Sequence, residues 1–482
     1  MLKKKGTQYF KLSVAFLFLT IIGLGALLAS GSEPFTPGKI IPEVRCANST
    51  FSYSLYLPPG YTAGTKSPVL FFLEAAARSE LPLELFKEAA DKYGYILVCS
   101  RQFQDGPYED NNRTMMAMWQ DVRQRFTVDP ARCYASGFSG GARGATRLHV
   151  MTQKALAGII ACGAGLDVRL KSADLPPAFF ISTIGLEDFN YKEMVKLEIE
   201  LQRASIDHII LVTGDNHRWP DSPVCTRTVE WLELQAMKTG SRSKDPALVD
   251  SLYQKELTIA NDLETVGKLY QAARGFEACE ILFKGLRDTS EAGSGKKRVI
   301  SAKDYKSFLK DEARRNKEEW EYISRFARAA QKIEAAPVTS STFREIKNEM
   351  GIPSLRKIID KGKNMYDVGW AKRLLTEVYM KFSRAGSYHL EKGDYKRSIL
   401  YLELVISATR FNAPVHVELA RAYSLDGDKK SALENLRTAV EKGYNDLAAI
   451  QNDKALESLR EEKEYKELLL KLQRETPEKK EE

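Results

Sequence analysis

Hydrophobic residues between positions 51 and 240 fall into short runs that alternate with longer amphipathic stretches. The run at 51–57 alternates apolar with polar residues, which is typical of a strand with one solvated face. The later runs are continuously apolar, which indicates strands covered on both faces; they lie at 69–73, 95–99, 132–135, 156–162, 178–184 and 208–213. Helix-like stretches separate them, at 83–92, 115–126, 142–151, 191–203 and 223–238. This alternation predicts an α/β domain over 51–240, built on a doubly wound, mostly parallel sheet.

Segments with neither pattern are predicted to be connections. Residues 32–50 are rich in Pro, Ser and Thr and are interpreted as a linker. Residues 101–114 contain Gly-Pro and Asn-Asn, so we expect a loop there, and residues 128–130 are expected to turn the chain into the next strand. Residues 286–300 combine Gly, Ser and Lys, which indicates a mobile connection.

The pattern changes at about residue 245, where strand-like runs give way to stretches rich in Leu, Ala, Glu and Lys. A turn at Gly393-Asp394, flanked by small and apolar positions, recurs 34 residues later at Gly427-Asp428. Thirty-four residues is the period of tetratricopeptide repeats. We therefore predict an all-α, tetratricopeptide-like domain over 245–473, with degenerate hairpins at 255–285 and 305–333 and a charged tail at 474–482.

The N-terminus has the pattern of a targeting segment. Three lysines at 3–5 precede an apolar stretch at 12–29, and Ala29-Ser30-Gly31 offers the small residues of a cleavage site. Residues 1–31 are predicted to be either a signal peptide or an uncleaved membrane anchor. Both imply a periplasmic or secreted protein that meets the membrane only through this segment.

Composition narrows the possible partners. The net charge of +8 is spread along the chain, and no block of Arg and Lys is interleaved with aromatic residues, so no nucleic acid partner is expected. The six cysteines match no metal-binding spacing, and we predict neither a metal nor a cofactor. Export makes disulfides permissible, but the sequence leaves their pairing open.

Candidate chemistry begins at Gly137-Phe138-Ser139-Gly140-Gly141, which lies between a predicted strand and a predicted helix. Gly-x-Ser-x-Gly in this position is the pattern of a nucleophile elbow, where a strained turn exposes a serine. Residues without bulk two positions before and after the serine let the strand and helix pass closely. Ser139 is therefore the candidate nucleophile.

A serine nucleophile needs a base, and the base needs an orienting group. Of the five histidines, only His217 follows the last predicted strand in a loop, so it is the candidate base. Asp188, after a Gly turn that follows the preceding strand, is the candidate acid. Glu187 is its reserve and Asp167 a third choice. The order Ser139, Asp188, His217 is that of α/β-hydrolases.

These segments together resemble one branch of that superfamily. Residues 128–132, the elbow, the Asp188 turn and His217-x-Trp219-Pro220 are similar to the polyhydroxybutyrate-depolymerase and feruloyl-esterase-like α/β-hydrolases over about residues 45–240. The resemblance implies an α/β-hydrolase fold and a secreted serine esterase that works through an acyl-enzyme. Trp219, in the most branch-specific piece, is assigned to substrate binding.

The chain departs from this branch beside the elbow. The branch usually has His-Gly after the strand that here ends at Leu73, whereas this chain reads Glu74-Ala75-Ala76. We assign the oxyanion hole to the backbone N–H groups of Gly140 and of Ala75 or Ala76. An ionised Glu74 aimed at the site would repel the oxyanion, and each donor of such a hole contributes about 3 kcal/mol to lowering the barrier. Alternatively, Glu74 pairs with Arg78 or Arg143.

The sequence thus favours an exported serine hydrolase acting on an ester. A hydrolase-like binding protein, whose helical repeats present a surface to a protein partner, is the alternative, and a peptidase or amidase on the same triad is the third possibility.

Overall fold

The computed structural model describes residues 35–153, 155–171, 179–335, 337–339, 341–409 and 412–475. The predicted signal peptide or anchor at 1–31, and residues 476–482 of the predicted tail, lie outside these ranges. Within them, no helix has both the length and the apolar character that a membrane span requires.

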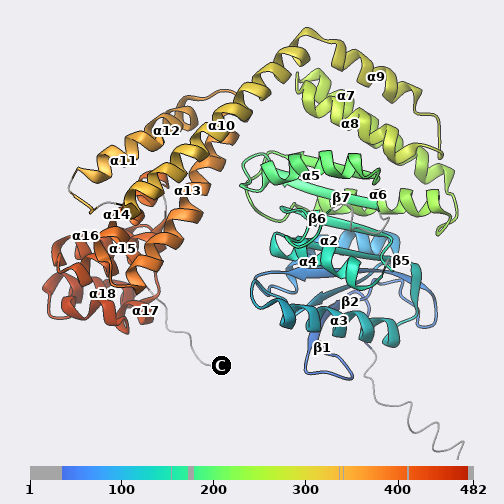
Figure 1. The fold of residues 1–482 in the computed structure, drawn as a ribbon. Coiled ribbons are helices and arrows are strands. Elements are labelled where there is room, and N and C mark those ends of the chain that lie inside the picture. The colour runs from blue at the N-terminus through green and yellow to red at the C-terminus, as the bar shows by residue number, and fades with distance from the viewer. Residues whose placement is uncertain are drawn as a thin grey trace, which may run out of the picture.

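An eight-stranded sheet forms the N-terminal half of the molecule (Figure 1). Its order is β1-β2-β4-β3-β5-β6-β7-β8, with β1–β2 and β2–β4 antiparallel and every later pair parallel. The strands are β1 Ile40–Arg45, β2 Ser52–Tyr56, β3 Ser67–Glu74, β4 Ile96–Ser100, β5 Val128–Phe138, β6 Gly158–Cys162, β7 Phe179–Gly185 and β8 His208–Thr213. The α/β-hydrolase fold class expected from the sequence is confirmed.

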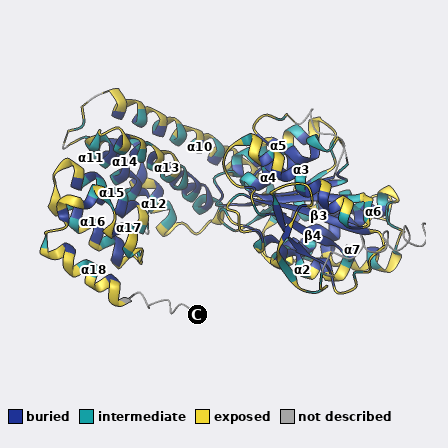
Figure 2. Cartoon of the chain, turned by 90° about the horizontal axis from the view of Figure 1, so that it is seen from below, coloured by how far each residue is buried: buried dark blue, intermediate teal, exposed yellow. Residues whose placement is uncertain are grey.

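Helices cover the sheet on both faces. Four of them connect strands, α2 Leu81–Tyr93, α3 Tyr108–Arg125, α4 Gly140–Met151 and α5 Tyr191–Arg203, and α6 Ser222–Thr239 follows β8. Alternate residues of β3 point to the two faces. Leu70 and Phe72 join the core that includes α2 and α6. Val69, Phe71 and Leu73 join the core that includes α3, α4 and α5. The continuously apolar strands therefore reflect burial on both sides, and Figure 2 shows the strands as the most buried part of this domain.

Three predicted connections around the sheet are wrong in part. The predicted linker at 32–50 contains β1, an edge strand that accommodates Pro42 because edge strands tolerate a missing N–H. The predicted loop at 101–114 ends early, since α3 begins at Tyr108 directly after Pro107. The predicted turn at 128–130 is the first part of β5, where Val128 lies opposite Ser67 of β3.

Three helices follow the sheet domain: α7 Pro246–Thr265, α8 Leu269–Phe283 and α9 Ser290–Ser301. Helix α8 packs against α6, and α7 and α9 pack against α8. Tyr253, Leu257 and Phe276 belong to the same hydrophobic core as Tyr95 and Trp231 of the α/β domain. The composition change near residue 245 is therefore not a boundary in packing. The predicted mobile connection at 286–300 is also wrong, because most of it is α9, with Ala292 and Val299 buried.

The rest of the chain forms a second lobe of helices (Figure 1). Its elements are α10 Lys303–Ala335, α11 Thr342–Met350, α12 Ile352–Lys361, α13 Met365–Glu391, α14 Tyr395–Ala408, α15 Ala413–Asp426, α16 Lys429–Glu441, α17 Leu447–Gln451, a 3₁₀ helix at Lys454–Leu459 and α18 Lys463–Glu475. We call α10–α18 the helical lobe. The hairpin predicted at 305–333 is wrong, because these residues belong to one continuous helix, α10. This helix runs from the sheet domain to the other helices of the helical lobe (Figure 1).

The 34-residue repeat corresponds to two helix pairs, α13–α14 and α15–α16, which pack against each other. Gly393 and Gly427 both have positive φ, at 76° and 89°, and end the first helix of each pair. Asp394 and Asp428 then cap the second helix by accepting from the N–H groups of Arg397 and Ser431. The repeat in the sequence is therefore a repeat of turn geometry.

Candidate active site

The turn between β5 and α4 holds Ser139 in a strained conformation, with φ 54° and ψ −117°. Two glycines make the turn possible. A Cβ on Gly141 would lie 1.9 Å from the carbonyl oxygen of Leu73, and one on Gly137 would lie 2.2 Å from the backbone of Gly141. Both contacts are with backbone atoms, which cannot rotate away. Only glycine fits on either side of this serine.

His217 comes from the loop after β8 and reaches Ser139 across the carboxyl edge of the sheet. Its Nε2 lies 2.9 Å from the Ser139 Oγ. The imidazole is held between two aromatic rings, with centroid distances of 4.6 Å to Phe138 and 4.3 Å to Phe189. These rings restrict the imidazole orientation while its Nε2 edge faces the serine.

Asp188 lies in the loop after β7 and is only 1% exposed. Its Oδ2 is 2.8 Å from the Nδ1 of His217, and its Oδ1 accepts from the Asn190 N–H at 2.8 Å. The loop approaches the His217 loop closely, because a Cβ on Gly185 would lie 2.1 Å from the Asp215 carbonyl oxygen. The glycine before Asp188 therefore lets acid and base meet.

The three residues form a continuous chain of hydrogen-bonding atoms from carboxylate to imidazole to hydroxyl. With Asp188 accepting from Nδ1–H, the free electron pair of His217 is on Nε2, which faces Ser139. Such an arrangement can remove the hydroxyl proton as Ser139 attacks a carbonyl carbon and can return it to a leaving group.

The other carboxylates considered as the acid have different partners. Glu187 points to the helical lobe, where its Oε1 lies 2.7 Å from the Lys372 Nζ. Asp167 is buried with Arg147 at 3.2 Å and accepts from the Tyr108 hydroxyl at 2.6 Å. The structure brings neither of them to His217.

Trp219 is placed in the core rather than at an open surface. It is 7% exposed, and its ring lies 5.7 Å from Phe138 and 6.4 Å from both Phe72 and Phe86. This packing puts Trp219 beneath the ring that supports His217. Trp219 therefore contacts the Phe138 ring that packs against His217, and it does not line an open surface where a substrate could bind.

Gly140 and Ala75 lie side by side next to Ser139. The Ala75 Cβ is 3.1 Å from the position that a Cβ on Gly140 would take. Gly140 is the first residue of α4, and the first N–H groups of a helix have no intrahelical acceptor. This N–H is therefore available to an oxyanion.

The Glu74 carboxylate is engaged by its own turn. Oε2 accepts from the N–H groups of Ala76 at 2.8 Å and Arg78 at 3.0 Å, and Oε1 lies 2.5 Å from the Arg78 guanidinium. Burial alone would raise the pKa of Glu74, but these three hydrogen bonds outweigh it and the pKa is lowered. Glu74 is thus an ionised carboxylate that shapes residues 75–78, in the pairing with Arg78 that the sequence left open.

Asp105, which comes from the loop before α3, was not predicted from the sequence to lie at the site. Its Oδ1 lies 2.1 Å from the position of a Cβ on Gly140, and its N–H donates to the Ala75 carbonyl. This exposed carboxylate therefore stands beside the two residues assigned to the oxyanion hole. Nothing in residues 101–114 except their polarity marked it, because the contact joins segments far apart in sequence.

All six cysteines are buried and unpaired, and burial raises the pKa of each thiol. In the described ranges, no three His, Cys, Asp or Glu side chains gather in a way that could hold a metal ion.

Neither a protein-family model nor a curated protein sequence matches this chain. Solved structures with a similar fold include Est1E from Butyrivibrio proteoclasticus, with 12% identity, a TM-score of 0.34, and coverage of 41% of this chain and 98% of that one. S-formylglutathione hydrolase from Staphylococcus aureus has 12% identity and a TM-score of 0.35 over 42% of this chain and 99% of its own. A fungal esterase from Rhizomucor miehei has 16% identity and a TM-score of 0.34 over 42% and 86%.

Proposed function

We propose that this protein is a serine hydrolase that cleaves carboxylic esters through an acyl-enzyme on Ser139. The observation that carries the proposal is the hydrogen-bonded series in which His217 lies 2.9 Å from the Ser139 hydroxyl and 2.8 Å from the Asp188 carboxylate. The serine also stands at a helix N-terminus in a strained turn, as a nucleophile elbow requires.

The reaction follows from these positions. The Ser139 Oγ attacks the ester carbonyl carbon while its proton passes to the His217 Nε2, and Asp188 stabilises the imidazolium that forms. The N–H groups of Gly140 and Ala75 bind the oxyanion. His217 then gives its proton to the departing alcohol as the ester C–O bond breaks. Water, deprotonated by His217, attacks the acyl-enzyme and releases the carboxylic acid and the free serine.

We place the enzyme in the polyhydroxybutyrate-depolymerase and feruloyl-esterase-like branch on the residues that carry that resemblance, above all His217-x-Trp219-Pro220. The residues at 1–31 support the further proposal that it is exported. The alternative of an inactive binding protein drew on Glu74. That carboxylate is bound by Ala76 and Arg78, so Glu74 itself gives no reason to expect a damaged oxyanion hole.

Labelling with a fluorophosphonate probe tests the proposal, because the probe phosphonylates only a serine activated by its base. The wild-type chain is expected to carry one adduct, on the peptide that contains Ser139, whereas Ser139→Ala and His217→Ala carry none. Ser49 and Ser301 serve as internal controls in the same digest, because the Ser49 hydroxyl accepts from the Phe51 N–H and the Ser301 hydroxyl donates to the Lys297 carbonyl rather than to an imidazole. Folded wild-type protein without an adduct on Ser139 would overturn the proposed activity.

A further inference from the structure

The loop that carries Asp188 is contacted by a helix from the other half of the chain. We call residues 186–191 the acid loop. One side of the acid loop is hydrogen-bonded to the loop that carries His217. The Leu186 N–H donates to the Thr213 carbonyl at 2.8 Å, and the Glu187 N–H donates to the Asp215 carbonyl at 3.0 Å. Helix α13 of the helical lobe covers its outer side. The acid loop is therefore held between the base-carrying loop and the helical lobe.

Arg373 on α13 makes the central contact. Its Nη1 donates to the Leu186 carbonyl at 2.5 Å, two residues before Asp188. Its guanidinium also lies 4.4 Å from the ring centroid of Tyr191, at the other end of the acid loop. One side chain thus touches both ends of the segment that presents the catalytic carboxylate.

A second helix fixes this arginine. Glu319 on α10 binds the Arg373 Nε and Nη2 at 3.1 and 2.9 Å, and both residues of this pair are at least 94% buried. Glu319 is also 3.2 Å from the Lys192 Nζ, which directly follows the acid loop. A buried guanidinium with a two-point carboxylate partner has one geometry, so its remaining donor points at Leu186 in a defined direction.

Two further contacts join α13 to the acid loop. Lys372 pairs with Glu187 at 2.7 Å. Gly369, one turn earlier, lies so close to the loop that a Cβ there would be 2.9 Å from the Leu186 side chain and 3.2 Å from its carbonyl oxygen. One face of α13 therefore packs closely against residues 186 and 187.

We infer that the helical lobe positions the catalytic acid, with Arg373 as the positioning residue. The inference rests on the proposed role of Asp188. Arg373 touches neither substrate nor the reacting atoms. It fixes the peptide from which Asp188 projects, and so fixes the 2.8 Å contact between Asp188 and His217. A displacement of about 1 Å in a catalytic group costs roughly 100-fold in rate, so this contact bears on turnover rather than on substrate binding.

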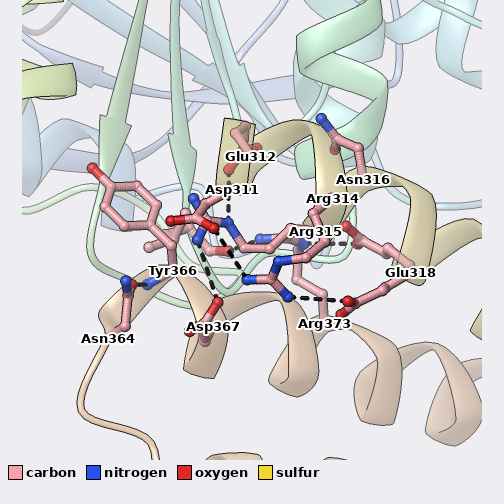
Figure 3. Close-up of polar contacts among 12 residues, drawn as sticks. Asp311, Glu312, Arg314, Arg315, Asn316, Glu318, Asn364, Tyr366, Asp367 and Arg373 are labelled. Carbon is pink, nitrogen blue, oxygen red and sulfur yellow. Dashed lines mark hydrogen bonds and ion pairs between the residues drawn. The ribbon is translucent and has the colours of Figure 1, made fainter. Parts of the chain in front are cut away.

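The chain offers a matched control in Arg315, shown in Figure 3. Arg315 is an equally buried arginine on α10 that binds Glu312 at 3.0 Å and Asp367 at 3.3 Å, both in the helical lobe. Arg373→Met and Arg315→Met each remove one buried guanidinium from the same region. Only the first removes a hydrogen bond to the acid loop.

The test compares full-length Arg373→Met, Arg373→Lys and Arg315→Met in turnover of p-nitrophenyl acetate and in hydrogen exchange of the peptide 186–191. For Arg373→Met we expect kcat to fall about 10- to 100-fold with KM within about twofold of wild type, and exchange in that peptide to rise. Arg373→Lys, which keeps a cation and one donor, is expected to recover part of kcat. Arg315→Met is expected to keep kcat within about twofold at a similar loss of thermal stability.

Equal losses of kcat in Arg373→Met and Arg315→Met, or a fall in kcat without increased exchange at 186–191, would overturn the inference.

Should Arg373→Met fail to fold, Lys372→Met replaces it, because the Lys372 side chain is 41% exposed. Its control is Lys381→Met, which breaks a 2.6 Å pair with Glu377 on the same helix. We expect kcat to fall two- to fivefold in Lys372→Met and to stay unchanged in Lys381→Met. Equal kcat values in the two variants would contradict the inference. An unreactive Ser139 in wild type defeats the proposed function instead, whereas exchange at 186–191 still tests the Arg373 contact.

Discussion

At the level of single residues, the turn around Ser139 can form only because Gly137 and Gly141 have no Cβ atom. Ser139 has φ 54°, and the two glycines around it leave room for the backbone of Leu73 and Gly141. The sequence predicted both the strain and the need for small neighbours, because Gly-x-Ser-x-Gly states them directly. The two backbone segments that fill the space became known only from the fold.

We expect Gly141→Ala to displace the turn, because its Cβ would lie 1.9 Å from the Leu73 carbonyl oxygen. Overpacking of this kind costs about 1–3 kcal/mol in unfolding free energy, and the displaced serine loses most of its reactivity. Gly214→Ala is the control, since a Cβ at Gly214 meets no atom within 4 Å. Urea unfolding and fluorophosphonate labelling measure both effects. Normal labelling of Gly141→Ala would contradict this account of the turn.

Glu74→Gln tests the role of the carboxylate beside the proposed oxyanion hole. The pKa of Glu74 is lowered in the folded protein, so its stabilisation is present above the ordinary pKa of the carboxyl and is lost as the pH falls through the lowered value. At neutral pH the variant is expected to lose about 1–3 kcal/mol of unfolding free energy.

The difference between wild type and Glu74→Gln should shrink as the pH falls from about 6 to about 3. Glu80→Gln, at an exposed carboxylate in the same segment that makes no capping hydrogen bond, is expected to lose less than about 1 kcal/mol. The midpoint of urea unfolding, measured at each pH, gives the comparison. A difference that grows toward low pH would mean that the Arg78 and backbone contacts do not stabilise the ionised form.

Among the site residues, Ser139, His217 and Asp188 could be chosen from sequence because each follows a predicted strand and only a few candidates existed. Asp105 could not be chosen, because its position beside Gly140 depends on how the 101–107 segment crosses Ala75. Local pattern places a residue at the edge of a sheet. It does not say which loops touch there.

At the level of elements, strands buried on both faces and helices between them were predictable because their apolar runs are continuous. The errors have physical reasons. The start of α3 carries the polar Glu109, Asp110 and Asn111, which favour a helix N-terminus as well as a loop. In α9, Gly293 and Gly295 lower the helix propensity of the sequence, so the segment was predicted to be a mobile connection. Gly295 is nevertheless required, because a Cβ there would lie 2.5 Å from the Phe276 ring.

The repeated Gly-Asp turn gives a prediction for the helical lobe. Asp428→Ala removes the oxygen that accepts from the Ser431 N–H at 3.0 Å, so it is expected to cost about 1 kcal/mol and to increase hydrogen exchange at the start of α16. Asp426→Ala is the control. It lies at the C-terminal end of α15, where a negative charge is unfavourable, so its removal should be neutral or slightly stabilising. Equal effects of the two substitutions would argue against capping.

At the level of the whole molecule, the first helices after residue 245, α7 and α8, are not a separate appendage. Composition marks a change there, but Tyr253, Leu257 and Phe276 complete a core that begins in the sheet domain. The sequence could not reveal this, because amphipathic helices show that one face is buried without showing against what. A protein partner for the helical repeats stays a prediction.

Two truncated chains test the boundary. A chain that ends after residue 240 exposes the core face that α7 and α8 cover, and it is expected to aggregate or to unfold at lower temperature. A chain that ends after residue 302 keeps that core and is expected to stay soluble, but it lacks Arg373 and should turn over esters more slowly. Thermal melting and size-exclusion chromatography measure the first difference. Equal stability of the two chains would place the boundary at residue 240 after all.

The proposed function requires Ser139 to be acylated and deacylated with His217 as its base. The most direct measurement is rapid mixing of full-length protein with p-nitrophenyl acetate, followed by acid quenching and mass spectrometry of the peptides. By this mechanism we expect a burst of p-nitrophenol and one transient acetyl group on the peptide that contains Ser139, with no burst in Ser139→Ala or His217→Ala. Steady release of p-nitrophenol that persists in Ser139→Ala, or an acetyl group on any other residue, would contradict it.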